Sequence, residues 1–289
     1  MHSVSSYVVV TPVRDEEKYL PLTIESMVQQ TILPTEWVIV NDGSTDRTGA
    51  IADDAAARYP WIRVVHRPNR GFRQAGGGVV EAFNAGYQAI VCKDWQFIVK
   101  LDGDLSFAPE YFSDCFVRFQ DSTLGIAGGG IYNMIDGKRV FEQCPVFHVR
   151  GASKIYSRPC WDAIGGFWPA PGWDTMDEVK AQRLGWGTKT FPELELTHHR
   201  YTGAADGTWK TLRKNGKANY ICGYHPLFMI AKCLGRLPRK PYILGSAALF
   251  YGFISGYFDG TPQVDDRATI SYLRQQQLYR LAGKSTIWR

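Results

Sequence analysis

Two carboxylates separated by one glycine follow an apolar run of the chain. Asp102 and Asp104 flank Gly103, and two residues separate this pair from the apolar run 97–99. Extended backbone points alternate side chains the same way, so we expect both carboxylates to face one ligand, with Gly103 letting it approach the backbone. Such hard oxygen ligands suit Mg²⁺ or Mn²⁺. The pair alone is a weak signal, because most such pairs are solvated turn residues.

A third acidic position opens a predicted helix in the second half of the chain. Asp174 could simply cap this helix, and the following Asp177 and Glu178 would favour its dipole. A carboxylate placed in a cleft can also take a proton from a hydroxyl group. A cap and a base are compatible roles, so Asp174 is the preferred base and the two neighbouring acids are the reserve candidates.

A basic, glycine-rich connection runs from residue 66 to 78. Its arginines, Arg67, Arg70 and Arg73, are either solvated loop residues or parts of a lid that reach phosphate oxygens, helped by a helix N-terminus. No Gly-Lys-Ser/Thr follows, which excludes a Walker loop. We favour a ligand role for part of this segment.

The elements that must position these groups alternate between strands and helices. Apolar β-branched runs predict strands at 7–11, 37–40, 62–65 and 97–99. Helices are predicted at 19–30, from the end of the 41–46 loop to about residue 58, and at 79–91. This alternation predicts an α/β fold with a doubly wound, mostly parallel sheet. Ligands of such sheets bind at the carboxyl ends of the strands, where the loops 11–17, 41–46 and 102–104 would meet.

Four motifs in this half resemble the inverting family 2 glycosyltransferases. They are Thr11-Pro-Val-Arg-Asp-Glu, Val38-Ile-Val-Asn-Asp-Gly-Ser-Thr-Asp, Asn69-x-Gly71 and Leu101-Asp-Gly-Asp. Their order and spacing agree with the family over roughly residues 5 to 200. The resemblance implies the nucleotide-sugar-binding GT-A fold and a divalent metal, Mg²⁺ or Mn²⁺.

The resemblance also assigns roles to residues of the donor site. The first loop would line the nucleobase and ribose pocket with Thr11, Pro12, Val13, Arg14 and Glu16. Asp42 would contact the base, and Asp102 with Gly103 would touch the ribose or a metal-bound water. Asp104 would bind the metal, with His198 or His199 as a late third ligand. Arg73 and Arg200 would face the diphosphate. The family's usual Ser-Ala-Ala-Arg-Asn is replaced here by Arg73-Gln-Ala-Gly-Gly-Gly.

The catalytic base of the family is the last residue of a Glu-Asp pair after a Gly-Gly-Phe. Counting back from Gly185-Trp186 places Asp174 in that slot, with Trp173 in place of the glutamate. No persuasive Ser-His-Asp or Cys-His arrangement accompanies it, which agrees with direct displacement at the sugar.

Composition and charge bound the remaining possibilities. The 289 residues are 45% hydrophobic and 21% charged, as expected of a globular chain. The six cysteines form no C-x-x-C pair, and no secretory signal is recognised, so we expect a reducing, cytoplasmic setting. Between residues 200 and 240 there are nine lysines and arginines against one aspartate. Without nucleic-acid motifs, a phosphorylated ligand or an anionic membrane surface fits this block better than nucleic acid.

The end of the chain predicts a helical extension. We divide the chain into a GT-A domain, 1–215, and a C-terminal extension, 216–289. Residues 241–258 carry no charge and contain Gly252-x-x-x-Gly256, which allows close helix approach. Three readings stay open: a soluble packing helix, an oligomer contact, or helices lying in a membrane surface. The flanking cations favour membrane association at a cytoplasmic face over a crossing.

Together these features predict a metal-dependent inverting glycosyltransferase at the inner face of the cell membrane. It would move a sugar from a nucleotide-sugar, UDP-linked donor to a glycan or lipid-linked acceptor in polysaccharide or glycolipid synthesis. One alternative is a sugar nucleotidyltransferase, which should show a glycine-rich loop with Arg and Lys after the first strand. Another is a non-catalytic nucleotide-sugar-binding subunit.

Overall fold

The computed structural model describes residues 6–71, 76–200 and 208–288. The strands are β1 (Tyr7–Val13), β2 (Glu36–Asn41), β3 (Ile62–His66), β4 (Phe97–Leu101), β5 (Leu105–Phe107), β6 (Leu124–Ile135), β7 (Lys138–Phe141), β8 (Ser153–Ser157) and β9 (Gly187–His198). The helices are α1 (Leu20–Val28), α2 (Thr48–Arg58), α3 (Gly77–Ala89), α4 (Tyr111–Arg118), α5 (Arg158–Ile164), α6 (Trp173–Arg183), α7 (Thr208–Ile221), α8 (Pro226–Arg236), α9 (Tyr242–Phe258) and α10 (Arg267–Leu281).

One sheet runs through the molecule in the order β3-β2-β1-β4-β8-β6-β9-β5, with β7 paired to β6. The first four strands in this order are parallel, as the alternation of strands and helices predicts. The other half is mixed, because β8 pairs antiparallel with both β4 and β6, while β9 runs parallel to β6. The predicted α/β class with a doubly wound sheet is confirmed, and its parallel part is the half formed by the first 101 residues.

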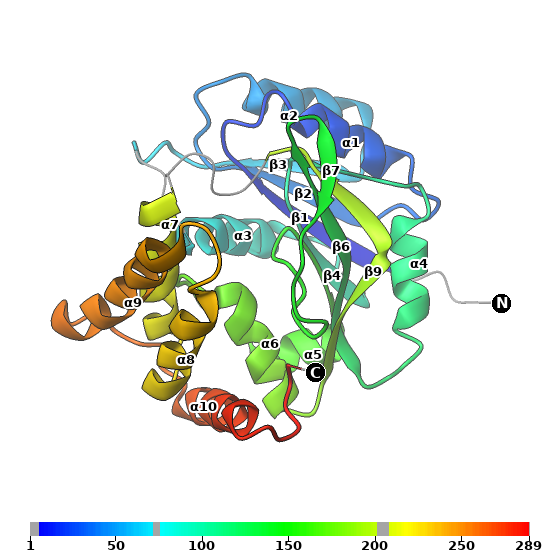
Figure 1. Cartoon of the computed structure of the whole chain (residues 1–289). Helices are drawn as coiled ribbons and strands as arrows, with labels where there is room; N and C mark the ends of the chain where they lie inside the picture. Colours follow the sequence, from blue (N-terminus) through cyan, green and yellow to red (C-terminus); the bar gives the residue numbers. More distant parts are fainter. Residues whose placement is uncertain (1–5, 72–75, 201–207, 289) are drawn as a thin grey trace.

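Alternation along β1 divides the core into two layers. Val9 packs on the face covered by α1, α2 and α4, while Val8 and Val10 pack on the face covered by α3 and α5. Figure 1 shows α1 and α2 on one side of the parallel strands and α3 on the other. Because both faces are covered, the strands are mostly apolar, and the carboxyl ends of β1, β2 and β4 carry the polar loops to one edge.

A third core cluster joins the C-terminal helices to α6. Met176 and Val179 of α6 pack with Tyr220, Phe253 and other residues of the last four helices. The predicted boundary at residue 215 falls inside α7, and the division into two domains stays a prediction. Figure 1 shows these helices grouped beside α6, away from α1 and α2.

The glycines of α9 are used inside the chain. A Cβ at Gly252 would lie 2.0 Å from the carbonyl oxygen of Arg213, and one at Gly256 would lie 2.1 Å from the ring of Tyr220, both on α7. The Gly252-x-x-x-Gly256 pattern therefore lets α7 and α9 approach each other closely. Among the described residues, no helix is long and apolar enough to cross a membrane.

Two connections shape the second half of the chain. Within the segment 147–156, strand β8 begins only at Ser153, after a turn at residues 151–152. Within the apolar run 220–231, α7 ends at Ile221, and Gly223, at a φ of +74°, turns the chain into α8.

Candidate active site

Asp102 and Asp104 meet across a turn. β4 ends at Leu101 and β5 begins at Leu105, so the two carboxylates project from a connection and not from alternate positions of a strand. They still converge: ligand atoms of Asp102, Asp104 and His198 all lie within 4.8 Å of one another. The predicted convergence is present, but the turn produces it in place of strand alternation.

Gly103 is required for packing. A Cβ at this position would lie 2.4 Å from Cγ1 of Val13, so a larger residue would collide with β1. The expected approach of a ligand to this glycine stays a prediction. Val13 itself is buried in the core under this turn. The glycine thus presses the turn against β1 and brings the first loop next to the two aspartates.

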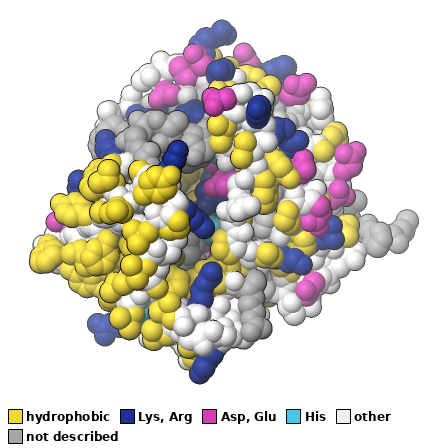
Figure 2. All heavy atoms as spheres, viewed as in Figure 1, with side chains coloured by type: hydrophobic (Ala, Val, Ile, Leu, Met, Phe, Trp, Pro, Cys, Tyr) yellow, Lys and Arg dark blue, Asp and Glu magenta, His cyan; other side chains and the backbone are white. Residues whose placement is uncertain are grey.

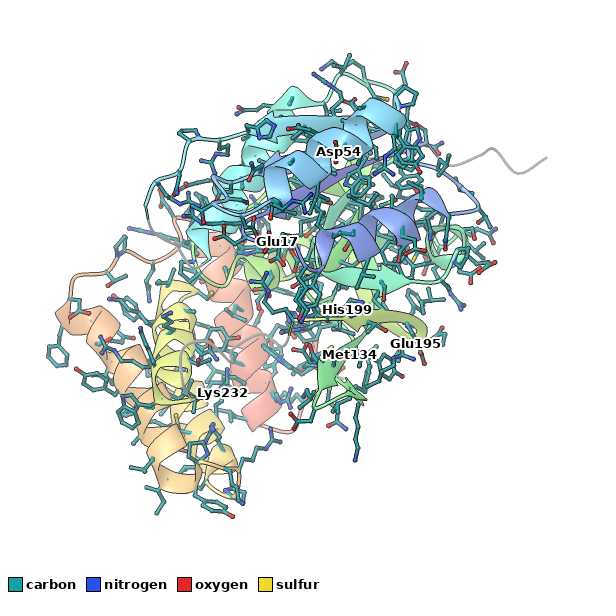
Figure 3. The ribbon with its side chains drawn as sticks, turned by 90° about the horizontal axis from the view of Figure 1, so that it is seen from above. Glu17, Asp54, Met134, Glu195, His199 and Lys232 are labelled. Atoms are coloured by element: carbon teal, nitrogen blue, oxygen red, sulfur yellow. The ribbon has the colours of Figure 1, made fainter. Side chains whose placement is uncertain are left out.

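The histidine pair at the end of β9 divides its roles by strand alternation. Nε2 of His198 lies 3.2 Å from Oδ1 of Asp104, inside the cluster. His199 points away: its Nε2 pairs with Oγ of Ser106 at 2.8 Å, and its ring stacks on Tyr19. Figure 3 shows His199 at the centre of the molecule, between the loop of Glu17 and the C-terminal helices that carry Lys232. Of the two histidines, His198 is the one placed to ligate a metal.

The cluster is electrostatically mixed. Arg200 forms an ion pair with Glu16, and its Nε lies 3.9 Å from Oδ2 of Asp104. Burial of Glu16, with the neighbouring charge of Asp104, raises the pKa of the Glu16 carboxyl to about 7. Burial disfavours protonation of His198, but the hydrogen bond and charge of Asp104 outweigh it and raise the pKa of this imidazole.

Asp102 is balanced by a lysine that the motifs did not reveal. Lys100 of β4 is buried and forms an ion pair with Asp102. Desolvation raises the pKa of Asp102, and repulsion by Asp104 adds to the rise against the pull of Lys100. A divalent cation would relieve this repulsion, and a set of two carboxylates and one imidazole is chemically suited to Mg²⁺ or Mn²⁺.

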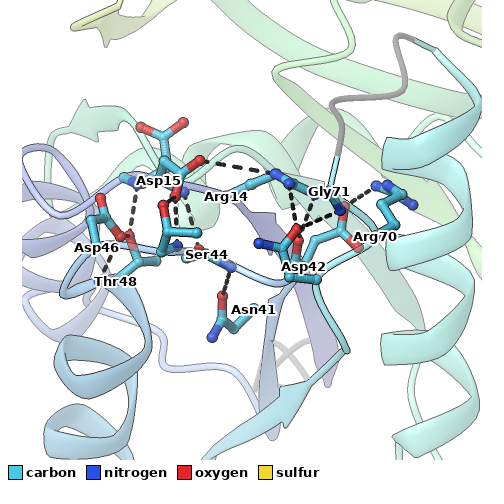
Figure 4. Close-up of polar contacts among 12 residues, drawn as sticks. Arg14, Asp15, Asn41, Asp42, Ser44, Asp46, Thr48, Arg70 and Gly71 are labelled. Atoms are coloured by element: carbon cyan, nitrogen blue, oxygen red, sulfur yellow. Dashed lines mark hydrogen bonds and ion pairs between the residues drawn. The ribbon is translucent and has the colours of Figure 1, made fainter.

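The loops after β1 and β2 interlock at the same edge of the sheet (Figure 4). Arg14 donates to the carbonyl oxygen of Asp42 at 3.2 Å and to Oδ1 of Asn69 at 2.9 Å. The Thr45 N–H donates to Asp15 at 2.8 Å. Gly43 has a φ of +70°, and a Cβ there would meet the backbone of Asn69 at 2.5 Å. The resemblance motifs around residues 14, 42 and 69 therefore form one contiguous surface.

The arginines of the basic connection turn toward an acid. Nη1 of Arg67 lies 2.6 Å from Oδ1 of Asp42, and Arg70 pairs with the other oxygen of the same carboxylate. Both arginines also lie near Glu81 of α3, at 3.7 and 3.2 Å. Their contact with phosphate stays a prediction, and Arg73 lies outside the described residues.

Thr11 is placed differently from the expectation. The residue is fully buried, and its hydroxyl accepts a hydrogen bond from the indole of Trp37 at 2.8 Å. In this structure Thr11 therefore anchors the first loop to the core. Pro12 remains partly exposed on that loop.

Asp174 lies in the first turn of α6, near the aspartate cluster. Its Cβ lies 3.4 Å from the point where a Cβ of Gly151 would stand, and the Gly151 carbonyl accepts a hydrogen bond from Lys100 at 2.5 Å. Lys100 in turn pairs with Asp102, so two residues connect Asp174 to the cluster. Among the described residues, the Asp174 carboxylate has no hydrogen-bond partner, and it is partly exposed.

The reserve candidates for the base are unsuited to that role. Asp177 and Glu178 are buried, and both pair with Nζ of the fully buried Lys154, at 2.9 and 2.8 Å. Glu178 also contacts Nδ1 of His148 at 2.7 Å. Lys154 holds the Asp174 backbone carbonyl at 2.6 Å as well. This network fixes the first turns of α6 and leaves Asp174 as the acid of this group that faces outward.

Sequence reasoning missed Lys100, Lys154 and His148. Lys100 stands in an apolar run that forms a strand, and lysine is rarely fully buried unless paired, whereas the strand of Lys154, Ser-Lys-Ile-Tyr-Ser, is half polar. The anomaly at Lys100 was the available signal. Burial would lower the pKa of Lys154, but the charges of Asp177 and Glu178 outweigh it and raise the value.

Comparison with known proteins decides the family. Residues 8–170 match the family model described as Glycosyl transferase family 2. The chain belongs to this family. As a family 2 glycosyltransferase it is an enzyme, and this membership lends no support to the nucleotidyltransferase alternative.

Relatives and solved structures agree with this membership. The chain is 32% identical over 133 residues to the uncharacterized glycosyltransferase EpsJ of Bacillus subtilis, covering 46% of this chain and 36% of that protein. It is 32% identical over 132 residues to the polyprenol monophosphomannose synthase of Mycolicibacterium smegmatis, covering 43% and 47%. The aligned stretch thus spans less than half of either relative.

Two solved structures share the fold along nearly the whole chain. The mannosyltransferase PcManGT from Pyrobaculum calidifontis, in complex with GDP-Man and Mn²⁺, has a TM-score of 0.59 at 15% identity, covering 98% of this chain and 89% of that one. TarS 1-349 of S. aureus, in complex with UDP-GlcNAc, has a TM-score of 0.56 at 13% identity, covering 96% and 92%. At such low identity these likenesses establish the fold, which is of the GT-A type.

Proposed function

We propose that this family 2 enzyme transfers a sugar, with inversion, from a UDP-linked donor to a glycan or lipid-linked acceptor with the help of a divalent metal. The observation that carries the proposal is the convergence of Asp102, Asp104 and His198 within 4.8 Å at the carboxyl end of β4. Support for a metal and a nucleotide-sugar comes from the two neighbouring structures, one in complex with GDP-Man and Mn²⁺ and the other with UDP-GlcNAc. The polyprenol monophosphomannose synthase supports a lipid-linked acceptor.

Asp102, Asp104 and His198 would hold the metal. A bound divalent ion would neutralise the negative charge that develops on the departing diphosphate. Arg200 stands beside Asp104 with its guanidinium one-third exposed, so it can turn from Glu16 toward the same phosphates. The loop surface around Arg14 and Asp42 would receive the nucleoside.

Asp174 would activate the acceptor. A neutral hydroxyl is a poor nucleophile, and a carboxylate within hydrogen-bond reach can accept its proton as the new bond forms. The acceptor oxygen then bonds to the anomeric carbon on the face opposite the diphosphate, the bond to the diphosphate breaks, and the proton remains on Asp174. The configuration at that carbon is inverted, and no covalent enzyme intermediate is formed.

The test is to incubate the enzyme with a panel of donors, Mg²⁺ or Mn²⁺, and acceptor extracts. Turnover is measured as the release of nucleoside diphosphate. We expect a UDP-sugar to be consumed and NMR of the product to show inversion. Asp174→Asn should lower kcat by about 10²- to 10⁴-fold while donor binding by calorimetry is kept. The matched control is Asp94→Asn, on an exposed turn. Absence of diphosphate release for every donor, or full activity of Asp174→Asn, would refute the proposal.

A further inference from the structure

The outer surfaces of α8 and α9 are apolar and uncovered. We call this surface the α8–α9 face and define it by Leu227, Leu234, Ile243, Leu244, Tyr251 and Phe258, whose exposed fractions lie between 56% and 85%. Figure 2 shows hydrophobic side chains gathered over this part of the molecule, on the left of the view. Scattered exposed apolar residues are normal on soluble proteins, but a contiguous group of this kind marks an interaction site.

The α8–α9 face runs along the length of both helices. Leu227 and Leu234 are seven residues apart on α8, and Ile243, Tyr251 and Phe258 follow each other at eight and seven residues on α9, so each set forms a stripe. The 17 residues of α9 extend about 25 Å. The opposite side of α9 is already used, because its glycines pack against α7. The stripe is thus left over after the chain has satisfied its own packing.

Cations border this face, and they have no acidic partner in the part of the chain that the structure describes. The connection between α8 and α9 carries Arg239 and Lys240, both exposed, next to Arg236 at the end of α8. From Pro226 to Phe258 the chain has no aspartate or glutamate. Ile243 and Leu244, in the first turn of α9 after this connection, are among the most exposed apolar residues that the structure describes. Apolar and cationic side chains therefore emerge together at one place.

We propose that the α8–α9 face docks on an anionic lipid surface, with its apolar side chains inserted at the headgroup boundary and Arg239 and Lys240 on lipid phosphates. Apolar area combined with positive charge is what interfacial binding requires. A second copy of the chain fits less well, because the face itself carries cations and no acidic residue from Pro226 to Phe258, so two such faces offer each other no charge complementarity.

Docking here would also position the active site. Met176 and Val179 of α6 share a core cluster with Tyr220 of α7 and Phe253 of α9, and α6 carries Asp174 in its first turn. The distance from the lipid surface to Asp174 would therefore be set by rigid packing. This consequence for a lipid-linked acceptor rests on the proposed function, whereas binding to lipid does not.

The experiment is co-sedimentation of the full chain with vesicles of equal parts phosphatidylglycerol and phosphatidylcholine, against vesicles of phosphatidylcholine alone. We expect binding to the anionic vesicles that weakens as salt is raised. Arg239→Gln with Lys240→Gln should lower the partition coefficient about 30-fold, since each cation near such a surface contributes about a factor of five. Ile243→Ser with Leu244→Ser should lower it by roughly 100-fold or more.

Matched controls change the same residue types elsewhere. The controls are Leu33→Ser, in the connection after α1, and Lys138→Gln, on β7, and both should bind as the parent does. Figure 1 shows α1 and β7 away from α8 and α9. All substituted residues are exposed, so circular dichroism and the melting temperature should be unchanged. The double variant of Arg239 and Lys240 tests the face independently of the double variant of Ile243 and Leu244.

Three results would overturn the inference. The first is no binding to anionic vesicles by a protein that turns over donor, which leaves the proposed function standing. The second is equal loss of binding in the control variants. The third is a dimer, measured by sedimentation equilibrium, that Ile243→Ser with Leu244→Ser dissociates, since this would assign the face to a second copy. Loss of donor turnover with retained vesicle binding would count against the proposed function alone.

Discussion

Replacing Lys154 by methionine should destabilise the fold strongly and in a pH-dependent way. Its ammonium is fully buried, 2.9 Å from Asp177 and 2.8 Å from Glu178, and it holds the carbonyl of Asp174. Methionine nearly matches the length of the lysine stem, so lost packing is a minor part of the change. The main effect is that two buried carboxylates lose their counter-charge. Breaking a buried pair in this way costs about 3–5 kcal/mol, out of a total stability of about 5–15 kcal/mol.

The pH dependence follows from the direction of the carboxyl pKa. Burial already raises the pKa of Asp177 from 3.8 to about 6, although Lys154 pulls it down. Removing Lys154 raises it further. A carboxyl whose pKa is higher in the folded than in the unfolded state stabilises the fold while it is protonated, and this contribution is lost as the pH rises through the folded pKa. The deficit of Lys154→Met should therefore be small near about pH 5 and largest near about pH 8.

Urea unfolding at several pH values, followed by circular dichroism, measures this deficit. The control is Lys189→Met, on the exposed face of β9, which should change the free energy of unfolding by less than about 1 kcal/mol. A deficit below about 1 kcal/mol for Lys154→Met, or one that does not grow with pH, would refute the reasoning from buried charge.

The remaining predictions concern the turn after β4 and the first loop. Gly103→Ala should lower the free energy of unfolding by about 1–3 kcal/mol, because its Cβ would lie 2.4 Å from a side chain of β1. The control Gly235→Ala, with nothing within 4 Å of its Cβ, should be neutral or stabilising. Equal effects of the two substitutions would contradict the packing argument. With nucleoside diphosphate present, we expect Mn²⁺ to raise the melting temperature of the parent protein, and Asp104→Asn should lose this rise while the exposed control Asp114→Asn keeps it. A shift retained in Asp104→Asn would remove this residue from the metal site. Without metal, burial raises the pKa of Glu16 from 4.5 to about 7, so the free energy of unfolding should fall as the pH rises through that range. Glu16→Gln should make this fall smaller. An identical pH dependence in the variant would show that this carboxyl is not the cause.

Much of the fold could be read from local patterns. The expected strands at 7–11, 37–40 and 62–65 correspond to β1, β2 and β3, and the uncharged run 241–258 corresponds to α9. Hydrophobic periodicity identified them because each of these elements buries a face that its own residues define. The parallel half of the sheet follows from their alternation with helices.

The candidate site was predictable in its membership more than in its geometry. Asp102, Asp104 and His198 do meet, but through a turn, and Gly103 serves the packing of Val13. Arg67 and Arg70 pair with Asp42, a contact that the sequence did not predict, while their contact with phosphate stays a prediction. Each of these differences involves a partner supplied by another loop or strand. A pattern within one segment contains no information on such a partner.

The sequence by itself determined which segments become strands and helices, which chemical groups stand at their ends, and the family to which those groups belong. Only the tertiary structure decided which charges neutralise each other and which apolar side chains stay outside. Asp177 and Glu178 became structural because β8 brings Lys154 under α6, and Asp174 was left free by the same contact. The physical reason is that the cost of burying a charge depends on every group around it, and these groups come from segments far apart in the chain.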